Sequence, residues 1–462
     1  MLMTRAEFDS EFLKRATGGE LVGAPSGERV ETDSRLELAG GLFVAITGPK
    51  FDGHDFVGEA FTKGATGAVV SRSWWGRNRS NITKLVVVDD TLTALHALAA
   101  AHRARRPIPL AAVTGSNGKT TTKELLALAL SPLGLVLKTE GNQNNHIGLP
   151  LTILRLTPKH RAAAVEIGLN HPGELAVLSR IAAPQVGAIT NVAASHLEGL
   201  GSVDGVARAK VEIAEGLGPD GVLVTPWDSP PLERVLHHYR GRRLTFGFTS
   251  QADVHPSHLT DRGPEGIEIA FREGVTVRVP LLGAHAALNV LAALAVATAL
   301  GIPLQAAAKP LEQVQATKGR LSPRRIGNVL LLDDTYNANP GSLAVALRVL
   351  EDLAISGNRW AILGDMLELG RDAKRLHEKA GADAAFLDGL IVVGELARSL
   401  GGGARTAGLK AGALHEAASC EDAADIALAH LHDGDVILVK GSRGMHLEHA
   451  VARLVERLGK AA

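Results

Sequence analysis

The chain has 462 residues, of which 45% are apolar and 21% charged, as is ordinary for a globular protein. Lys+Arg and Asp+Glu number 49 each, and this balance does not indicate nucleic acid or another polyanion as a partner. A single cysteine, Cys420, excludes an intrachain disulfide framework. Because the first residues also show no apolar signal peptide, we expect a cytoplasmic protein, by length one of about three domains.

Residues 1–88 are predicted to form the first domain, which is small and of the α/β class. Short apolar strands, such as the one over 67–71, alternate with polar loops rich in Gly, Asp and Ser. Such loops can hold a polar ligand, although each one alone is more often a simple turn. A helix rich in Leu and Ala is expected over 91–104, and Pro107 and Pro109 close the linker.

The segment 113–124 is predicted to be the functional centre of the chain. It lies between an apolar run that predicts a buried strand and a Leu/Ala-rich run that predicts a helix. A glycine loop in this position directs backbone N–H groups at phosphate oxygens, Lys119 reaches the β- and γ-phosphates, and Thr120 ligates Mg²⁺. Because Val113 replaces the first glycine of a full Walker A motif, the six-residue match alone leaves a ligand-free turn open. The expected nucleotide-binding residues are Gly115, Ser116, Asn117, Gly118, Lys119, Thr120 and Thr121.

Residues 89–316 are predicted to form the second domain, in which strands and helices alternate. Glu166 ends a predicted strand, His196 follows the next one, and Lys210 lies on the helix after that. Each alone has a structural alternative, but together with a phosphate loop they indicate Mg²⁺ and nucleotide chemistry at the carboxyl edge of a sheet. The apolar window 281–300 is predicted to be a buried helix rather than a membrane span. An amide-rich loop over 138–148 can bind a ligand or form turns; its asparagines are Asn142, Asn144 and Asn145.

Residues 317–462 are predicted to form the third domain, a doubly wound sheet with strands over 329–333, 360–364, 390–394 and 436–441. Three loops that follow these strands, 333–340, 364–370 and 440–444, are the candidate functional loops. Asp365 and His377 either tie one loop to its helix or contact substrate, and the sequence leaves both readings open. Cys420 opens a predicted helix and is expected to be buried or to cap it.

Taken together, these motifs make the chain resemble the ATP-dependent Mur ligases over nearly its whole length. Within that family it resembles the branch that joins D-alanyl-D-alanine to UDP-N-acetylmuramoyl-tripeptide (UDP-MurNAc-tripeptide). The resemblance implies an N-terminal domain for the UDP-sugar, a central ATPase domain and a C-terminal Rossmann-like domain that brings the amine. The matching motifs are Asp33-Ser34-Arg35, Thr114–Thr121, Gly141-Asn142 with Asn144-Asn145, Asn191 with His196-Leu197-Glu198-Gly199, Ala209-Lys210, Asp333–Pro340, Leu363–Gly370 with His377, and Lys440–Gly444.

The reaction implied by this resemblance phosphorylates the peptide carboxylate with ATP, and an amine then attacks the acyl phosphate. Two anions must meet, so cationic charge has to gather between them. The resemblance implies one Mg²⁺ at Thr120 and Glu166, and a second at His196 and Lys210. Because a lysine cation is a poor metal ligand, Lys210 is expected to be carbamylated. Catalytic roles fall to Lys119, His196 and Lys210.

The resemblance also implies how the ligands are held. His285 and Asn289 are expected near the adenine, Asp334 at the ribose hydroxyls and Arg320 at the phosphates. Because the last two belong to another domain than Lys119, the site is expected to be complete only after domain closure. The expected substrate-binding residues are Ser34, Arg35, Asn142, Asn144, Asn145, Asn337 and Asn339.

The chain departs from the family pattern at several positions near the expected adenine and peptide contacts. They are Gln143, His146, Ala284, Ala286 and the segment Thr225-Pro226-Trp227-Asp228, where Asn-Ala-Asp is usual. An amino-acid-adding Mur ligase that acts on UDP-MurNAc-dipeptide is the alternative, but its Asp-Asn-Pro-Arg motif is absent. A folylpolyglutamate synthase fits the first domain less well. A nucleotide-binding subunit that has lost the reaction is a further alternative. Loss of Lys119, Glu166, His196 or Lys210 would support it, but all four residues are present. A monomer is the default expectation.

Overall fold

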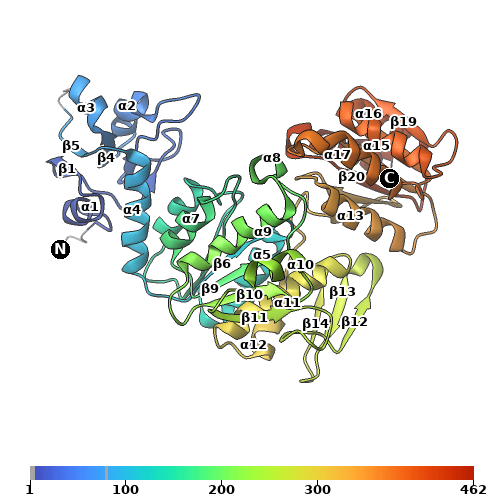
Figure 1. Ribbon diagram of the computed structural model, residues 1–462. Helices are drawn as coiled ribbons and strands as arrows, with labels where there is room; N and C mark the ends of the chain where they lie inside the picture. Colours follow the sequence, from blue (N-terminus) through green and yellow to red (C-terminus); the bar gives the residue numbers. More distant parts are fainter. Residues whose placement is uncertain (1–5, 79–81, 462) are drawn as a thin grey trace.

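The computed structural model describes residues 6–78 and 82–461, so the first residues of the signal-peptide prediction lie outside the described part. Three α/β bodies follow one another along the chain, with the N-terminal body at one end, the central body in the middle and the C-terminal body at the other end (Figure 1). In the described ranges, no helix has both the length and the apolar character needed to cross a membrane. The fold is therefore of the predicted three-domain α/β class, while the boundaries at 88 and 316 stay predictions.

The N-terminal body is built on a five-stranded sheet of order β1-β5-β4-β3-β2, parallel except for the antiparallel pair β1–β5. Along β4, Val69 packs into one apolar cluster while its neighbours Ala68 and Val70 pack into another, so both faces of the sheet are covered. The elements are β1 Glu20–Gly23, β2 Val30–Glu31, β3 Leu42–Val44, β4 Gly67–Ser71, β5 Lys84–Val88, α1 Ser10–Thr17, α2 Val57–Thr62 and α3 Arg72–Arg77.

Helix α4, Thr91–Ala104, joins the N-terminal body to the central one. Its buried residues, among them Leu95 and Leu98, belong to an apolar cluster that also contains Phe8 of the first body and Ile153 of the second. The helix spans the predicted range, and the two bodies share one core along it.

The central body contains a parallel six-stranded sheet of order β11-β10-β9-β6-β8-β7. The chain runs from β6 toward β7 and β8 on one side and then crosses to β9 on the other, so the strand order reverses beside β6. Ligands of open α/β sheets bind at the carboxyl ends of the strands at such a reversal. The elements are β6 Leu110–Thr114, β7 Val136–Lys138, β8 Ala162–Glu166, β9 Val186–Ile189, β10 Val222–Pro226, β11 Arg242–Phe246, α5 Lys119–Ala129, α6 Gly148–Leu154, α7 Glu174–Ala182, α8 Leu197–Leu200, α9 Val203–Val211 and α10 Pro230–Leu236.

Helix α11, Ala284–Ala299, is the most apolar element of the central body. It packs against α5, against the strands β9 to β11 and against β13, and this apolar surrounding confirms the prediction of a buried helix over 281–300. The antiparallel sheet β12-β13-β14 beside it was not predicted from the sequence. The remaining elements are β12 His258–Asp261, β13 Ile267–Ala270, β14 Thr276–Val279 and α12 Leu304–Ala308.

The C-terminal body holds a six-stranded sheet of order β15-β16-β20-β17-β18-β19, in which only β15 is antiparallel. The last strand, β20, lies between β16 and β17 and brings the loop 440–444 between the loops that follow those two strands. The four predicted strands are present, and β15 and β19 were not predicted. The elements are β15 Ser322–Ile326, β16 Val329–Asp334, β17 Arg359–Gly364, β18 Gly389–Val393, β19 Leu414–Ala417, β20 Val436–Lys440, α13 Pro340–Asp352, α14 Ala373–Ala382, α15 Glu395–Thr406, α16 Cys420–His430 and α17 Glu448–Ala461.

Asp365, His377 and Cys420 all have hydrogen-bond partners within the C-terminal body. His377 is fully buried and its Nε2 accepts a hydrogen bond from the Met366 N–H at 2.9 Å. Asp365 accepts one from the Ala397 N–H at 2.7 Å. Both side chains therefore hold strand-end loops in place, which is the structural one of the two roles that the sequence left open. Cys420 is half-buried at the start of α16, where its Sγ donates to the Met445 carbonyl.

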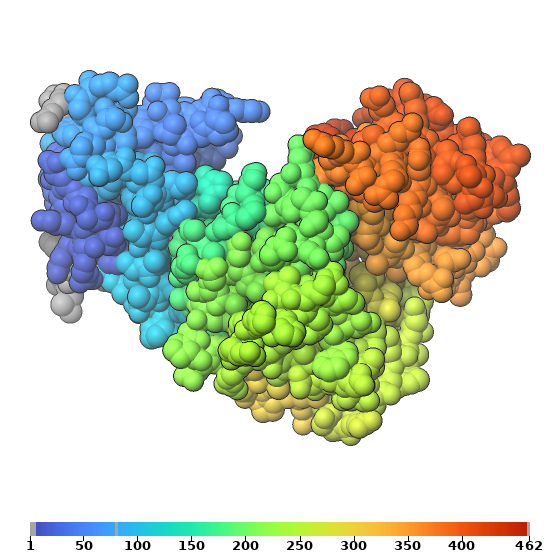
Figure 2. Space-filling view, viewed as in Figure 1, coloured from blue at the N-terminus to red at the C-terminus, as the bar shows by residue number. Residues whose placement is uncertain are grey.

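The N-terminal and C-terminal bodies stand apart on either side of the central one, with a hollow between them (Figure 2). The loops after β6, β8 and β9 and those after β16, β17 and β20 line one cavity of about 1190 Å³. Two sheets thus present their carboxyl edges to the same space.

Candidate active site

The glycine loop between β6 and α5 has the backbone conformation that its sequence requires. Gly118 has φ +78°, and a Cβ placed there would lie 2.3 Å from Asn289 Oδ1. A Cβ on Gly115, with φ +154°, would lie 1.8 Å from Thr190 Oγ1. Both positions exclude a side chain, so the backbone of the loop packs closely on its support.

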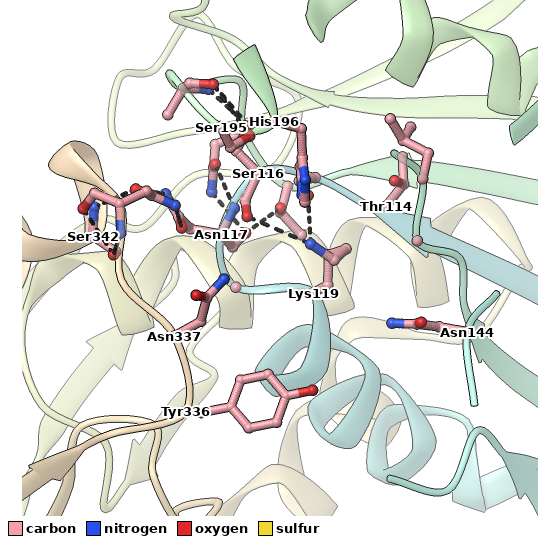
Figure 3. Close-up of a pocket in the computed structure, with 18 of the residues that line it drawn as sticks. Thr114, Ser116, Asn117, Lys119, Asn144, Ser195, His196, Tyr336, Asn337 and Ser342 are labelled. Carbon is pink, nitrogen blue, oxygen red and sulfur yellow. Dashed lines mark hydrogen bonds between the residues drawn. The ribbon is translucent and has the colours of Figure 1, made fainter. Parts of the chain in front are cut away.

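The loop is held by the residues that follow β9. Thr190 Oγ1 and Asn191 Nδ2 donate to the Asn117 carbonyl at 2.6 and 2.9 Å, and the Asn117 N–H donates to Asn191 Oδ1 at 3.0 Å. Ser116 Oγ accepts from the Ala193 N–H at 2.9 Å and from Ser195 Oγ at 3.0 Å. These contacts meet around the loop in Figure 3. Hydrogen bonds from the protein itself therefore hold the loop in this conformation.

Lys119 begins α5 and points back over the loop, where its Nζ donates to the Gly115 carbonyl at 2.8 Å (Figure 3). Burial lowers the pKa of this amine, the nearby Glu166 carboxylate raises it, and the Arg320 charge lowers it. A cation over a cluster of backbone N–H groups at a helix N-terminus can bind phosphate.

Glu166, at the end of β8, is 2% exposed and accepts two side-chain hydrogen bonds. They come from Thr120 Oγ1 at 2.9 Å and from Asn144 Nδ2 at 2.8 Å. Mg²⁺ in nucleotide sites is bound by one or two carboxylates together with phosphate oxygens and waters. In residues 6–78 and 82–461, three or more His, Cys, Asp or Glu side chains nowhere gather as a metal site. The Thr120–Glu166 oxygen pair therefore fits Mg²⁺ only if a bound phosphate supplies further ligands.

Lys210 lies on α9 and lines the cavity, although its side chain is only 2% exposed. Burial, and secondly the positive charge of Lys119, hold the pKa of the Lys210 amine well below its usual value. Both effects disfavour the charged ammonium form of this side chain.

His196 meets Glu368, which was predicted only as a member of the candidate loop 364–370. Its Nδ1 donates to Glu368 Oε2 of the C-terminal body at 2.9 Å, and the hydrogen bond lowers the pKa of Glu368. Both residues adopt left-handed backbone conformations, with φ +52° and +61°, which non-glycine residues rarely do. The imidazole therefore faces a carboxylate across the cavity, and its role as a metal ligand stays a prediction.

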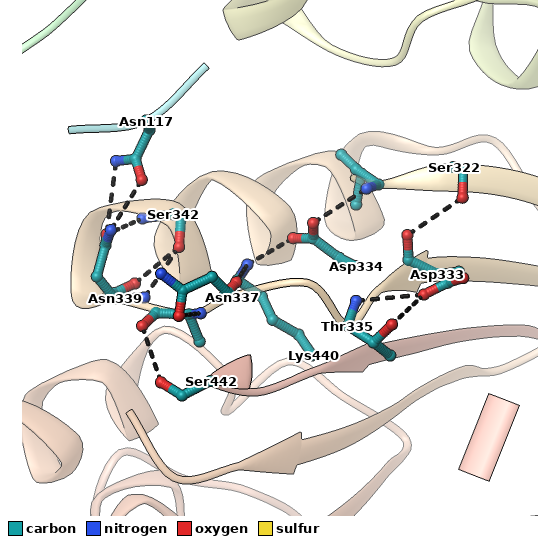
Figure 4. Close-up of polar contacts among 12 residues, drawn as sticks. Asn117, Ser322, Asp333, Asp334, Thr335, Asn337, Asn339, Ser342, Lys440 and Ser442 are labelled. Atoms are coloured by element: carbon teal, nitrogen blue, oxygen red, sulfur yellow. Dashed lines mark hydrogen bonds and ion pairs between the residues drawn. The ribbon is translucent and has the colours of Figure 1, made fainter. Parts of the chain in front are cut away.

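Asp334, which is expected to bind the ribose, forms a buried ion pair with Lys440 in the C-terminal body. Lys440 Nζ donates to Asp334 Oδ2 at 2.6 Å and to the Asn337 carbonyl at 2.9 Å, while Asp334 Oδ1 accepts from the Leu321 N–H at 3.0 Å (Figure 4). Burial raises the pKa of Asp334, although the Lys440 charge opposes this. Each carboxylate oxygen keeps a lone pair for a hydroxyl group. Lys440 was expected only as the first residue of the candidate loop and motif 440–444, and its ion pair with Asp334 was not predicted.

The C-terminal body contacts the phosphate loop directly. Asn339 Nδ2 donates to Asn117 Oδ1 at 2.8 Å, as Figure 4 shows. Arg320 Nη2 donates to Thr120 Oγ1 at 3.0 Å, and its guanidinium lies over the Tyr336 ring at 3.8 Å. The cavity is therefore assembled from two bodies.

Most of the predicted residues line this cavity, but three do not. Thr120 lies behind it on Glu166; the Ser34 carbonyl accepts from Lys63, and the exposed Arg35 pairs with Asp33 in the N-terminal body. The lining also includes Ser195, together with residues that were predicted only as members of the candidate loops 333–340, 364–370 and 440–444, namely Tyr336, Leu367, Glu368, Lys440 and Arg443. The predicted residues that line it are Gly115, Ser116, Asn117, Gly118, Lys119, Thr121, Asn142, Asn144, Asn145, Glu166, His196, Lys210, His285, Asn289, Arg320, Asp334, Asn337 and Asn339.

His285 is expected to stay neutral to about pH 4. Burial, and secondly the charge of Lys440, lower its pKa from 6.5 to about 4. The unfolded chain binds this proton at higher pH than the folded chain does. The free energy of unfolding therefore falls as the pH is lowered from 6.5 to about 4. Histidine-selective NMR titration should show one resonance that titrates near pH 4 and is absent in His285→Gln. Titration of that resonance near pH 6.5 would contradict the burial of the ring.

Comparison with known proteins agrees with this geometry. Residues 113–297 match the Mur ligase middle domain, and residues 319–443 match the Mur ligase glutamate ligase domain. A UDP-N-acetylmuramoyl-tripeptide–D-alanyl-D-alanine ligase of Bacillus subtilis is 37% identical and covers 92% of this chain and 93% of its own.

Solved structures give the same result. MurF from Acinetobacter baumannii superposes with a TM-score of 0.88 at 33% identity over 97% of this chain and 99% of its own. MurF from Thermotoga maritima in complex with ADP gives 0.83 at 30% identity over 94% and 98%. The chain therefore belongs to the Mur ligase family, among its UDP-N-acetylmuramoyl-tripeptide–D-alanyl-D-alanine ligases.

Proposed function

We propose that this protein catalyses the ATP-dependent addition of D-alanyl-D-alanine to UDP-MurNAc-tripeptide, as the names of its relatives describe for them. The observation that carries the proposal is the single cavity in which the phosphate loop of the central body faces Arg320 and Asn339 of the C-terminal body. ATP and a second anionic ligand can meet there. The product is UDP-MurNAc-pentapeptide, and the location is the cytoplasm, where ATP and nucleotide sugars are found.

The chemistry assigned to this chain is phosphorylation of the peptide carboxylate followed by attack of the dipeptide amine. Lys119 and the loop N–H groups hold the β- and γ-phosphates, and Arg320 neutralises charge from the opposite side. The carboxylate oxygen attacks the γ-phosphorus and ADP leaves. The amine then attacks the acyl carbon, and phosphate leaves with the former carboxylate oxygen.

The remaining ligand contacts follow from the lining of the cavity. His285 and Asn289 contact the adenine and Asp334 contacts the ribose. The amides of Asn142, Asn144, Asn145, Asn337 and Asn339 bind the peptide and the dipeptide, and Ser34 and Arg35 of the N-terminal body hold the UDP-sugar. The protein acts as a monomer with three domains, 1–88, 89–316 and 317–462.

Metal ions complete the charge balance in this proposal. Thr120 and Glu166 hold one Mg²⁺, and His196 with Lys210 holds a second. The metal supplies Lewis-acid neutralisation of the phosphates when bound. CO₂ reacts only with an unprotonated amine, and burial, which lowers the pKa of Lys210, makes the loss of its proton easier. Its carbamate offers oxygen ligands that the ammonium form lacks.

The proposal is tested by phosphate release with Mg-ATP, UDP-MurNAc-tripeptide and D-Ala-D-Ala, with one component omitted at a time. Release is expected only with all three. Release with UDP-MurNAc-dipeptide and a single amino acid instead would assign the protein to the amino-acid-adding branch.

A further inference from the structure

The proposed reaction leaves one charged group of its substrate unaccounted for. D-Ala-D-Ala enters with a free carboxylate at the end remote from the attacking amine, and this carboxylate is not consumed. A carboxylate that loses water in a cavity needs a cation or hydrogen-bond donors. On the proposed function, on which this inference rests, a side chain of the C-terminal body must supply the cation or the donors.

Two of the three cations that this body contributes to the cavity are already engaged. Lys440 is 2% exposed and donates to Asp334 and to the Asn337 carbonyl. Arg320 donates to Thr120 beneath the phosphate loop. Lys440 cannot turn to the dipeptide carboxylate without giving up its contacts, and Arg320 lies at the phosphate loop, where the proposed function assigns it to the phosphates.

Arg443 is the third cation, and its guanidinium is available. The side chain is 65% exposed, and its closest carboxylate is Glu448 Oε1, 4.0 Å from Nη1, which is too long for a hydrogen bond. Within the described part of the chain, no hydrogen bond of 3.5 Å or less engages this guanidinium. The fork of N–H donors matches a carboxylate in two parallel hydrogen bonds.

The backbone that carries Arg443 is fixed by its neighbour Ser442, which is 4% exposed. The Ser442 N–H donates to the Asp365 carbonyl at 3.0 Å, and its Oγ accepts from the Leu367 N–H at 2.8 Å and donates to the Ala338 carbonyl at 3.2 Å. Arg443 thus rises from the junction of the loops after β16, β17 and β20. Half-exposed Leu367 lies beside it, 3.0 Å from where a Cβ on Gly444 would be, and gives apolar surface for a methyl group.

The spacing suits a dipeptide. Arg320 and Arg443 lie 3.8 and 5.6 Å from the centre of the same Tyr336 ring, so their guanidinium carbons are less than about 10 Å apart, whereas two extended residues span at most about 7 Å. With the amine near the phosphate end, where Arg320 lies, the carboxylate of the dipeptide comes within reach of Arg443.

We propose that Arg443 binds the C-terminal carboxylate of the incoming dipeptide and makes the enzyme selective for a free carboxylate at that end. Leu367 packs against an alanine methyl group beside it. Arg443 does not take part in bond making; it fixes the dipeptide so that the amine faces the acyl group.

The test compares D-Ala-D-Ala with D-alanyl-D-alaninamide, which lacks the negative charge, in the wild type and in Arg443→Gln. The wild type should prefer the carboxylate about 10- to 100-fold in kcat/KM, as expected for a charged hydrogen-bonded pair. In Arg443→Gln the KM for D-Ala-D-Ala should rise about 10- to 100-fold with kcat changed less, and the preference should disappear. Arg443→Lys should retain part of it.

Arg325→Gln, which removes an exposed arginine outside the cavity, is the matched control and should behave as the wild type. If the wild type turns over and Arg443→Gln keeps the full preference, the carboxylate subsite is wrong while the proposed function stands. If the wild type turns over neither dipeptide with UDP-MurNAc-tripeptide, the proposed function fails and takes the subsite with it.

Discussion

Lys119→Met is expected to lower kcat about a thousandfold, equivalent to about 4 kcal/mol of transition-state stabilisation. The variant removes the Lys119 charge that lies over the phosphate loop while it keeps most of the apolar volume, and the loop itself is held by Thr190 and Asn191. Charge that develops on the transferred phosphoryl group then lacks its nearest protein cation. Steady-state phosphate release at saturating substrates measures the effect.

The control for this variant is Lys309→Met, an exposed lysine of the central body outside the cavity. It should leave kcat unchanged. Affinity for UDP-MurNAc-tripeptide, measured by calorimetry, should change little in Lys119→Met, because the defect concerns the triphosphate. A Lys119→Met protein with a kcat within about threefold of the wild type would contradict the role of the loop.

Lys210→Arg is expected to be as inactive as Lys210→Met, each with a loss of at least about a hundredfold in kcat. If Lys210 acted as a cation, arginine would preserve its charge and much of the activity. If it acts as a carbamate, arginine cannot replace it, because its guanidinium does not deprotonate. The buried amine with its lowered pKa favours the second reading.

A direct measurement separates the carbamate from a change in packing. In ¹³C-bicarbonate, the wild type should show a carbamate carbon resonance that Lys210→Met lacks, and both variants should still bind ADP. Near wild-type turnover by Lys210→Arg, or an unchanged ¹³C spectrum in Lys210→Met, would contradict carbamylation.

Much of the fold follows from local patterns in the sequence. The helix over 91–104 and the central parallel strands were predictable because apolar runs of strand length alternate with Leu/Ala-rich runs of helix length. The strands β12, β13 and β14 were not predicted, since they are short and only one face of β13 and β14 is buried. The edge strand β15, with Arg324 and Arg325 exposed, has no apolar run at all.

The candidate site was predictable where a motif joins chemistry to local structure. Lys119, Glu166 and Lys210 were found in this way, and all three line the cavity. The sequence could not reveal partners that depend on how the two bodies meet. Glu368 opposite His196 is such a case. The ion pair of Lys440 with Asp334 lies within the C-terminal body, but it joins residues 106 positions apart on two adjacent strands, and local patterns do not show which strands are adjacent.

The measurement that tests the central claim most directly follows oxygen from the peptide to phosphate. UDP-MurNAc-tripeptide labelled with ¹⁸O in its terminal carboxylate is incubated with Mg-ATP and D-Ala-D-Ala, and phosphate and product are analysed by mass spectrometry. An acyl-phosphate ligase should transfer one ¹⁸O into each phosphate released and give a product heavier by the dipeptide. Released phosphate that contains no ¹⁸O, because its fourth oxygen came from water, together with no heavier product, would contradict the account.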